Sequence, residues 1–341
     1  MSEHFAIGMA VIFISGALTG SFPFPMKYTR TWKWENTWLV FAMVALLILP
    51  CALAAAFVPH LTQVYREVPL RALYVPLIFG FLWGIAQVTF GIGISAMGMA
   101  LAFSVVSGLS CLSGSLVPLL VLNPANLFRP RGILLLVSMP ILFAGLALYG
   151  LAGRRRDEEQ SPGGQTRTTS MSFIAGLAVC IFTGVFGSNL NLGFAFSAPV
   201  LEKAVQLGAR TTTSTYASWA LVLSAGFIPN LLYCVRLLFR NRAWHVFMQP
   251  GGLRETGLGI AMGLLWLSGM VGYGIGTTLV GSYGTSLGFA MFTTAMILAS
   301  NLLGIFSGEW KATSKRTRTI LAGAVVAILI SVLVLNLGGL F

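Results

Sequence analysis

The chain has 341 residues, of which 56% are hydrophobic and only 9% are charged, against about 25% charged residues in an ordinary soluble domain. Its mean hydropathy is +0.85. These values exclude a soluble globular enzyme, a disordered chain and a secreted disulfide scaffold. The apolar segments are long unbroken runs rather than short alternating stretches, so they predict an all-α polytopic membrane protein and not a β-barrel.

The formal net charge is +12. The basic residues lie in short gaps between apolar runs, so we expect them to set membrane orientation rather than to bind nucleic acid. The four cysteines are widely spaced within apolar runs and form no C-x-x-C pair. This spacing indicates neither a zinc site nor a disulfide framework, and no cofactor is expected.

Ten apolar runs are long enough to cross a membrane, which takes about 20 residues. The first begins near the N-terminus without a basic flank or a small-residue cleavage site, so it indicates a spanning helix rather than a cleaved signal peptide. In chain order the predicted spans are 5–24, 38–57, 72–94, 99–121, 132–151, 172–194, 212–235, 256–280, 285–306 and 319–339.

A polar segment separates the fifth span from the sixth. It begins with three consecutive arginines and three consecutive acidic residues, followed by Ser161-Pro-Gly-Gly, a composition typical of a solvated linker. The predicted organisation is therefore a first five-helix unit (1–151), a polar cytoplasmic linker (152–171) and a second five-helix unit (172–341).

The two units resemble each other in sequence. Residues 8–16 and 176–184 share Gly, Ala, Val and Gly in register, and residues 80–93 and 263–276 share a Leu-Trp pair and a Gly-Ile-Gly. An odd number of helices per unit forces the second copy to insert upside down. The pattern predicts two inverted five-helix repeats, a build found in many secondary transporters, with substrate held near the midplane.

The loops carry an unequal share of positive charge. Fifteen of the 21 Lys and Arg residues follow odd-numbered predicted spans, and six follow even-numbered ones. By the positive-inside rule, the odd-numbered loops are cytoplasmic and both termini lie on the outer side of the membrane.

No ionisable residue lies at a predicted midplane, which favours a neutral polar substrate. Several amide and aromatic side chains do lie at that depth, and a site that pairs an amide with an aromatic plane suits the hydroxyls and the C–H face of a sugar. The alternative is that these amides only bridge helices and the aromatic residues only fill the core. The candidates for substrate binding are Trp83, Gln87, Asn189, Asn191, Trp266 and Tyr273.

Charged residues with a candidate role lie just outside the spans. Glu35 is near the start of the second span, where the positive helix end favours a carboxylate, and Lys27 precedes it in the same connection. The pair could be structural, or it could gate the cytoplasmic mouth. The tryptophans around Glu35 are also typical of interface anchors.

Several motifs carry a resemblance to the L-rhamnose–proton symporter family of the drug/metabolite transporter superfamily. The most specific is Trp32-x-Trp34-Glu35-x-x-Trp38. The others are Phe22-Pro-Phe-Pro25-Met-Lys27, Leu49-Pro50, Phe79-Gly80-x-x-Trp83-Gly84, Gly98-Met99, Leu265-Trp266 and Gly308-Glu309-Trp310.

The resemblance implies ten helices from an inverted duplication. It also implies uptake of L-rhamnose, or a closely related sugar, with a proton as coupling ion across the bacterial inner membrane. Glu35 and Glu309 are the carboxylates that match the family's motifs.

The function expected from the sequence is therefore a secondary active importer of a deoxy-sugar that works by alternating access. An exporter of amphipathic drugs or metabolites on the same fold is the main alternative, because a charge-poor aromatic cavity suits such molecules too. A membrane-embedded enzyme or sensor is a further alternative. The sequence contains no Gly-x-x-x-x-Gly-Lys-[Ser/Thr], His-Glu-x-x-His or Gly-x-Ser-x-Gly motif, so neither ATP-driven transport nor an enzyme is supported.

Overall fold

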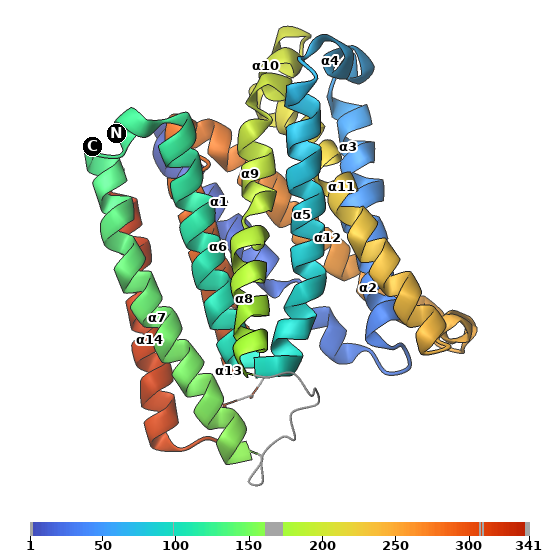
Figure 1. Ribbon diagram of the computed structural model, residues 1–341, viewed down its shortest axis with the longest axis vertical. Helices are drawn as coiled ribbons and strands as arrows, with labels where there is room; N and C mark the ends of the chain where they lie inside the picture. Colours follow the sequence, from blue (N-terminus) through green and yellow to red (C-terminus); the bar gives the residue numbers. More distant parts are fainter. Residues whose placement is uncertain (1–2, 98, 161–172, 307, 309, 338–341) are drawn as a thin grey trace.

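The computed structural model describes residues 3–97, 99–160, 173–306, 308 and 310–337, and these form helices without any strand (Figure 1). The first half contains α1 (Glu3–Ser21), η1 (Phe24–Tyr28), α2 (Trp34–Ala42), η2 (Met43–Ile48), α3 (Leu49–Phe57), α4 (Leu61–Glu67), α5 (Arg71–Met97), α6 (Met99–Leu122), η3 (Pro124–Asn126) and α7 (Pro130–Gln160). The second half contains α8 (Phe173–Gly187), α9 (Asn189–Phe196), α10 (Ala198–Gln206), α11 (Thr211–Arg240), η4 (Trp244–Met248), α12 (Gly252–Val280), η5 (Gly281–Tyr283), α13 (Leu287–Phe306) and α14 (Lys315–Leu337).

Ten helical segments of the described chain are long and apolar enough to span a membrane, and each overlaps one of the ten predicted spans. Their outward surfaces remain apolar. Ile14 is 60% exposed and Leu333 is 64% exposed. Such side chains would be unfavourable against water, but they match a hydrocarbon solvent. The all-α polytopic fold is confirmed.

Two of the spans are not single straight helices. The second contains a π-helical turn, η2, directly before Pro50, which lacks the backbone N–H that a regular helix needs. The sixth, predicted as 172–194, continues to Gln206 and is divided into α8, α9 and α10 at Ser188 and Ser197. Both serine hydroxyls donate to the carbonyl three residues earlier, at 2.7 and 2.6 Å, and so offer the backbone local bonds where the helix is interrupted.

The fifth span extends beyond its predicted end at residue 151. α7 continues to Gln160, nine residues into the predicted linker. A hydrogen-bonded ion pair between Arg154 and Glu158, four residues apart at 3.0 Å, stabilises this extra turn. The rest of the linker, residues 161–171, lies outside the described residues.

The helices pack in two related sets. α1 lies against α12 and α13, while α8 lies against α5 and α6. α7 and α14 form a separate pair, visible at the left of Figure 1. Helices approach closely where side chains are small: a Cβ on Gly80 of α5 would lie 2.1 Å from the backbone oxygen of Val222 on α11. Such contacts let α5 and α11 pack backbone to backbone.

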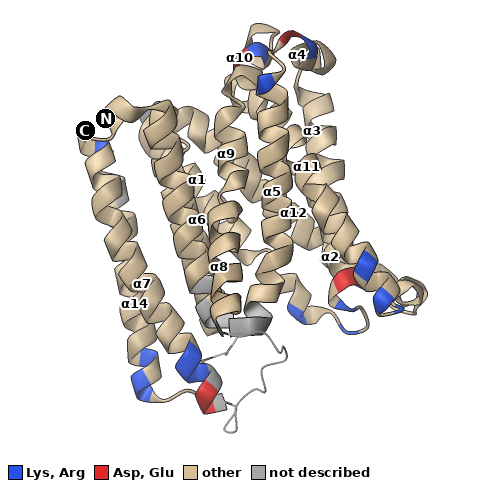
Figure 2. Cartoon of the chain, viewed as in Figure 1, with Lys and Arg blue, Asp and Glu red and all other residues tan. Residues whose placement is uncertain are grey.

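Among the described residues, Lys, Arg, Asp and Glu lie at the two ends of the bundle and not in its long middle section (Figure 2). We call the lower end in Figure 1 the basic end. It carries the basic connections between η1 and α2 and between α11 and η4, and the start of α14. The opposite end carries α4, α10, η3 and η5. This segregation is expected for a membrane protein, because an unpaired charge is costly in hydrocarbon.

Candidate functional site

Two predicted tryptophans meet in the middle of the bundle. Trp83 on α5 and Trp266 on α12 stack with ring centroids 5.7 Å apart and planes 24° apart, and they are 4% and 3% exposed. Phe41 on α2 meets Trp266 edge-on at 6.2 Å. Residues from three spans, two in the first half of the chain and one in the second, therefore form one aromatic centre.

Two predicted amides lie beside this centre. Gln87 is one helical turn beyond Trp83; it is half-buried and makes no hydrogen bond to any other described side chain or backbone group. α9 runs antiparallel to α5, with Gly193 packed against Phe79, so Asn189 lies at the level of Trp83. Asn189 is 6% exposed and likewise has no side-chain partner within the described chain. Both amides retain hydrogen-bonding capacity that a ligand or water can satisfy.

The other two predicted residues bind each other. The Tyr273 hydroxyl on α12 donates to Asn191 Oδ1 on α9. Asn191 Nδ2 donates to the carbonyl oxygens of Gly114 and Thr285, both at 2.7 Å. Asn191 is 1% exposed and Tyr273 is 2% exposed. In this conformation the Asn191 amide has used its donors and engaged its oxygen within the protein, so it is not available to a substrate.

Glu35 is a buried carboxylate at the basic end. It lies in the first turn of α2 and is 4% exposed. Its Oε1 accepts a hydrogen bond from Asn241 Nδ2 at 2.8 Å, just beyond the end of α11. Lys33 donates to the Asn241 carbonyl at 3.1 Å, and Asn36 donates to the Ala243 carbonyl at 3.0 Å. The start of α2 is thus fastened to the end of α11, with a neutral amide as the partner of the carboxylate.

The remaining predicted charged residues are placed differently. Lys27 lies in η1 with its ammonium 5.6 Å from the Phe24 ring centroid, and it does not form an ion pair with Glu35. Glu309 lies outside the described residues. A role of Lys27, Glu35 or Glu309 in gating or coupling stays a prediction.

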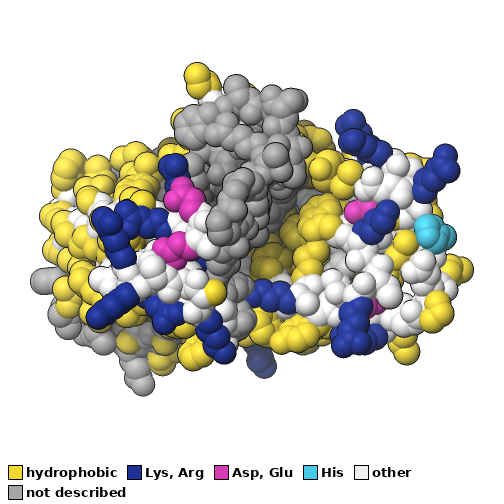
Figure 3. Space-filling model, turned by 90° about the horizontal axis from the view of Figure 1, so that it is seen from below, with side chains coloured by type: hydrophobic (Ala, Val, Ile, Leu, Met, Phe, Trp, Pro, Cys, Tyr) yellow, Lys and Arg dark blue, Asp and Glu magenta, His cyan; other side chains and the backbone are white. Residues whose placement is uncertain are grey.

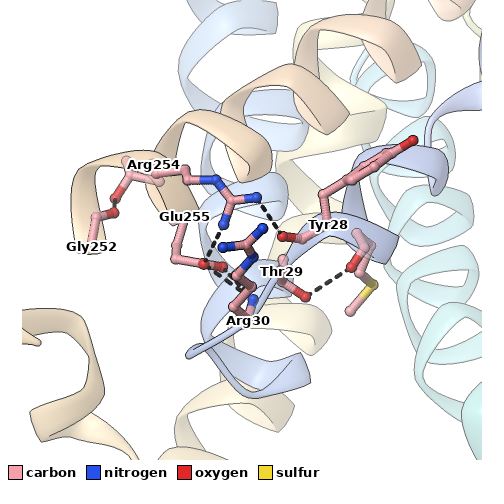
Figure 4. A network of polar contacts seen from close by, with 8 residues as sticks. Tyr28, Thr29, Arg30, Gly252, Arg254 and Glu255 are labelled. Atoms are coloured by element: carbon pink, nitrogen blue, oxygen red, sulfur yellow. Dashed lines mark hydrogen bonds and ion pairs between the residues drawn. The ribbon is translucent and has the colours of Figure 1, made fainter. Parts of the chain in front are cut away.

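A second buried carboxylate, which was not predicted as a site residue, also lies at the basic end. Glu255 in the first turn of α12 is 2% exposed. Figure 4 shows its carboxylate between Arg254, whose Nη1 is 3.3 Å away, and the backbone N–H of Arg30 at 3.1 Å. Arg254 Nη2 also donates to the Tyr28 carbonyl at 2.9 Å. The glycine pair Gly251-Gly252 at the start of α12 could have placed Glu255 in the first turn of a helix. The sequence could not show that this carboxylate is buried against Arg30, which is 225 positions away.

The face of the basic end combines positive charge with apolar surface. Figure 3 shows Lys and Arg side chains gathered at the two sides of this face, with apolar side chains between them. Within the described chain, no three His, Cys, Asp or Glu side chains gather closely enough to hold a metal ion.

The bundle has a discontinuous span, and amides without hydrogen-bond partners lie beside an aromatic centre. This is the build of a secondary transporter, a multi-pass membrane protein rather than an enzyme. Comparison with known proteins specifies the family of transporters. The sequence model of the L-rhamnose-proton symport protein (RhaT) family matches residues 1–340, and the chain belongs to this family.

Individual relatives extend over the same length. The chain is 22% identical to the L-rhamnose-proton symporter of Cronobacter sakazakii over 345 residues, which cover 99% of both chains. Proteins of the same name from Escherichia coli O1:K1 / APEC and Shigella flexneri are 22% and 23% identical, again over 99% of both chains.

Proposed function

We propose that this chain imports L-rhamnose, or a closely related deoxy-sugar, together with a proton across the bacterial inner membrane. The observation that carries this proposal is the aromatic centre of Trp83 and Trp266. Beside it lie the amides of Gln87 and Asn189, which have no hydrogen-bond partner within the described chain. A sugar offers hydroxyls to amides and a C–H face to an aromatic ring. The names of the relatives add the substrate and the coupling ion.

The proposed sugar site lies between α5, α9 and α12, with Trp83 and Trp266 as the aromatic walls and Gln87 and Asn189 as hydrogen-bonding groups. Neither amide has a hydrogen-bond partner among the described residues. A bound sugar can satisfy both amides and be oriented by them.

Glu35 is the proposed proton-binding group. It is buried, and its only described hydrogen-bond partner is the neutral amide of Asn241. It also belongs to the motif Trp32-x-Trp34-Glu35-x-x-Trp38, which resembles the symporter family, and a carboxylate can bind and release a proton. Lys27 and Glu309 stand as further candidates for coupling or gating.

The packing supports the inverted repeat and alternating access. The first span (α1) contacts the eighth and ninth (α12 and α13), while the sixth span (α8) contacts the third and fourth (α5 and α6). These are the same contacts with the two halves exchanged, as a pseudo-twofold axis in the membrane plane requires. With the basic end placed in the cytoplasm, both termini are periplasmic.

The competing functions are less well supported. An exporter of amphipathic molecules would share the fold, but the family and the named relatives favour a rhamnose importer. A membrane-embedded enzyme has no support from the family, which consists of symporters.

Uptake of labelled L-rhamnose into proteoliposomes, with and without an imposed inward proton gradient, tests the proposal. We expect accumulation only with the gradient. Equilibration without gradient-driven accumulation would retain the sugar and remove the coupling. No uptake by protein that elutes as a single folded species would overturn the substrate assignment and bring the exporter forward.

A further inference from the structure

Asn191 joins four separate elements through one side chain. Its amide lies on α9, its two donors reach the carbonyls of Gly114 on α6 and of Thr285 before α13, and its oxygen accepts from Tyr273 on α12. We call Asn191, Tyr273 and these two carbonyls the clasp. The clasp links α6 and α9 on one side to α12 and the start of α13 on the other. Any separation of the two sides must break it.

The clasp lies on one side of the aromatic centre. Tyr273 is seven residues further along α12 than Trp266, which is about 10 Å at 1.5 Å per residue. α12 begins at the basic end and finishes at Val280, close to the opposite end, where Thr285 connects η5 to α13. The clasp therefore lies between the proposed sugar site and the opposite end of the bundle.

Close packing surrounds the clasp. A Cβ on Gly114 would lie 2.2 Å from the Phe289 ring, so only glycine lets α6 and α13 approach this closely here. The Tyr273 ring lies 4.9 Å from Phe292 and 6.2 Å from Phe289 by ring centroids. These aromatic rings therefore pack closely around the hydrogen bonds of the clasp.

One donor next to the clasp has no partner at all. The Trp219 indole nitrogen is fully enclosed and makes no hydrogen bond within the described chain. It lies against Gly274, the residue after Tyr273, where an added Cβ would be 2.7 Å from Nε1. A buried indole N–H without an acceptor is costly, so the Trp219 N–H is a donor that an incoming hydroxyl can satisfy.

From these observations we infer that the clasp is the gate between the sugar site and the opposite end, and that an entering sugar replaces its hydrogen bonds. Opening the clasp leaves the Asn191 amide and the Tyr273 hydroxyl without their hydrogen-bond partners, and it exposes the Trp219 N–H. Sugar hydroxyls both donate and accept, so a sugar can satisfy all of these groups at the moment of entry. The sugar's part in this inference rests on the proposed function. The inference that the clasp is a gate does not depend on which molecule is transported.

The experiment uses Cys111 as a reporter. This cysteine is 0% exposed and lies one turn before Gly114 on α6, on the central side of the clasp. The full-length chain with Cys51, Cys180 and Cys234 changed to alanine is purified in detergent. The rate at which Cys111 reacts with N-ethylmaleimide is then measured for this parent and for variants made in it.

We expect N191A to raise the labelling rate roughly tenfold, the factor that corresponds to about 1.4 kcal/mol of lost hydrogen bonding. Y273F keeps the ring packing and removes one hydrogen bond, so it should raise the labelling rate by a smaller factor. It also provides a second test of the clasp if N191A does not fold. N301A is the matched control: Asn301 is also buried, but its amide donates only to its own helix, at Ile297. It should label like the parent.

Transport kinetics test the sugar half of the inference. The KM for L-rhamnose uptake should rise roughly tenfold in N191A, by the same hydrogen-bond argument, and stay unchanged in N301A. Labelling of N191A at the parent rate would overturn the gate. Faster labelling with an unchanged KM would overturn the sugar's role in it. If the unmodified protein transports no rhamnose, the proposed function fails, and the labelling rates still decide whether the clasp is a gate.

Discussion

Two carboxylates are buried in the described part of the chain, and they occupy equivalent local positions but have partners of different charge. Glu35 and Glu255 each lie in the first turn of a helix at the basic end, and they are 4% and 2% exposed. Glu35 is held by the neutral amide of Asn241, whereas Glu255 is held by the cationic Arg254 and the Arg30 backbone N–H. The two carboxylates therefore share burial and differ in the charge of their partners, so substitutions at each can be compared directly.

The largest effect expected from this comparison concerns transport. Glu35→Gln should abolish gradient-driven accumulation of L-rhamnose and leave exchange of labelled for unlabelled sugar measurable, because the amide resembles the protonated carboxylate in shape and charge. The measurement is uptake and exchange in proteoliposomes at several external pH values. Full pH-dependent accumulation by this variant would show that Glu35 is not the coupling residue.

A difference in stability should follow from the same contrast. Arg254→Gln leaves the Glu255 carboxylate buried without its cation, and we expect a loss of about 1–3 kcal/mol in free energy of unfolding, moderated by solvent around the half-exposed guanidinium. Glu35→Gln should cause no loss, because it removes a buried charge that has no cationic partner. Thermal unfolding in detergent measures both.

The control for this prediction is an ion pair of similar chemistry on the surface. Arg154 and Glu158 are 72% and 61% exposed, so Glu158→Gln should change stability by less than about 0.5 kcal/mol. Equal losses in Arg254→Gln and Glu158→Gln would mean that the Glu255 pair contributes no more than a surface pair.

A smaller and more local effect is expected at the aromatic centre. Trp266→Ala removes one wall of the proposed sugar site and should raise the KM for uptake roughly tenfold, equivalent to about 1.4 kcal/mol. Trp266→Phe retains an aromatic ring, so its KM should lie between those of the unmodified protein and Trp266→Ala. Gln87→Ala should also raise the KM, by the loss of one hydrogen bond. If sugar affinity is unchanged in folded, inserted Trp266→Ala and Gln87→Ala proteins, the site lies elsewhere.

The smallest effect concerns an exposed carboxylate far from both buried ones. Hydrogen bonds from the Ser314 hydroxyl, then from its backbone N–H and from Thr317, lower the pKa of Glu159 below its usual value of 4.5. A lowered folded-state pKa contributes stability above that usual value, and the contribution is lost as the pH falls through the lowered pKa. Ser314→Ala should bring the pKa back toward 4.5. Titration of the Glu159 carboxyl by NMR in the two proteins measures this change. An unchanged pKa in Ser314→Ala would show that the Ser314 hydroxyl does not lower the pKa of Glu159.

The sequence by itself determined the class of protein and the number of spans. Apolar runs of spanning length, with charge confined to the gaps between them, depend only on local composition, and all ten coincide with helices of the structure. The motifs around Glu35 and Trp83 were also sufficient to identify the family, which matches the chain over residues 1–340.

The tertiary structure decided which of the candidate side chains act together. Asn191 and Tyr273 are 82 positions apart, and nothing local indicated that they bind each other. The sequence likewise placed Glu255 at a helix end without showing that Arg30 and Arg254 enclose it. In a membrane, hydrophobicity inserts helices but does not pair them, because lipid is as apolar as a helix surface. Pairing depends on small residues and interhelical hydrogen bonds between distant segments, and these become defined only when the bundle has packed.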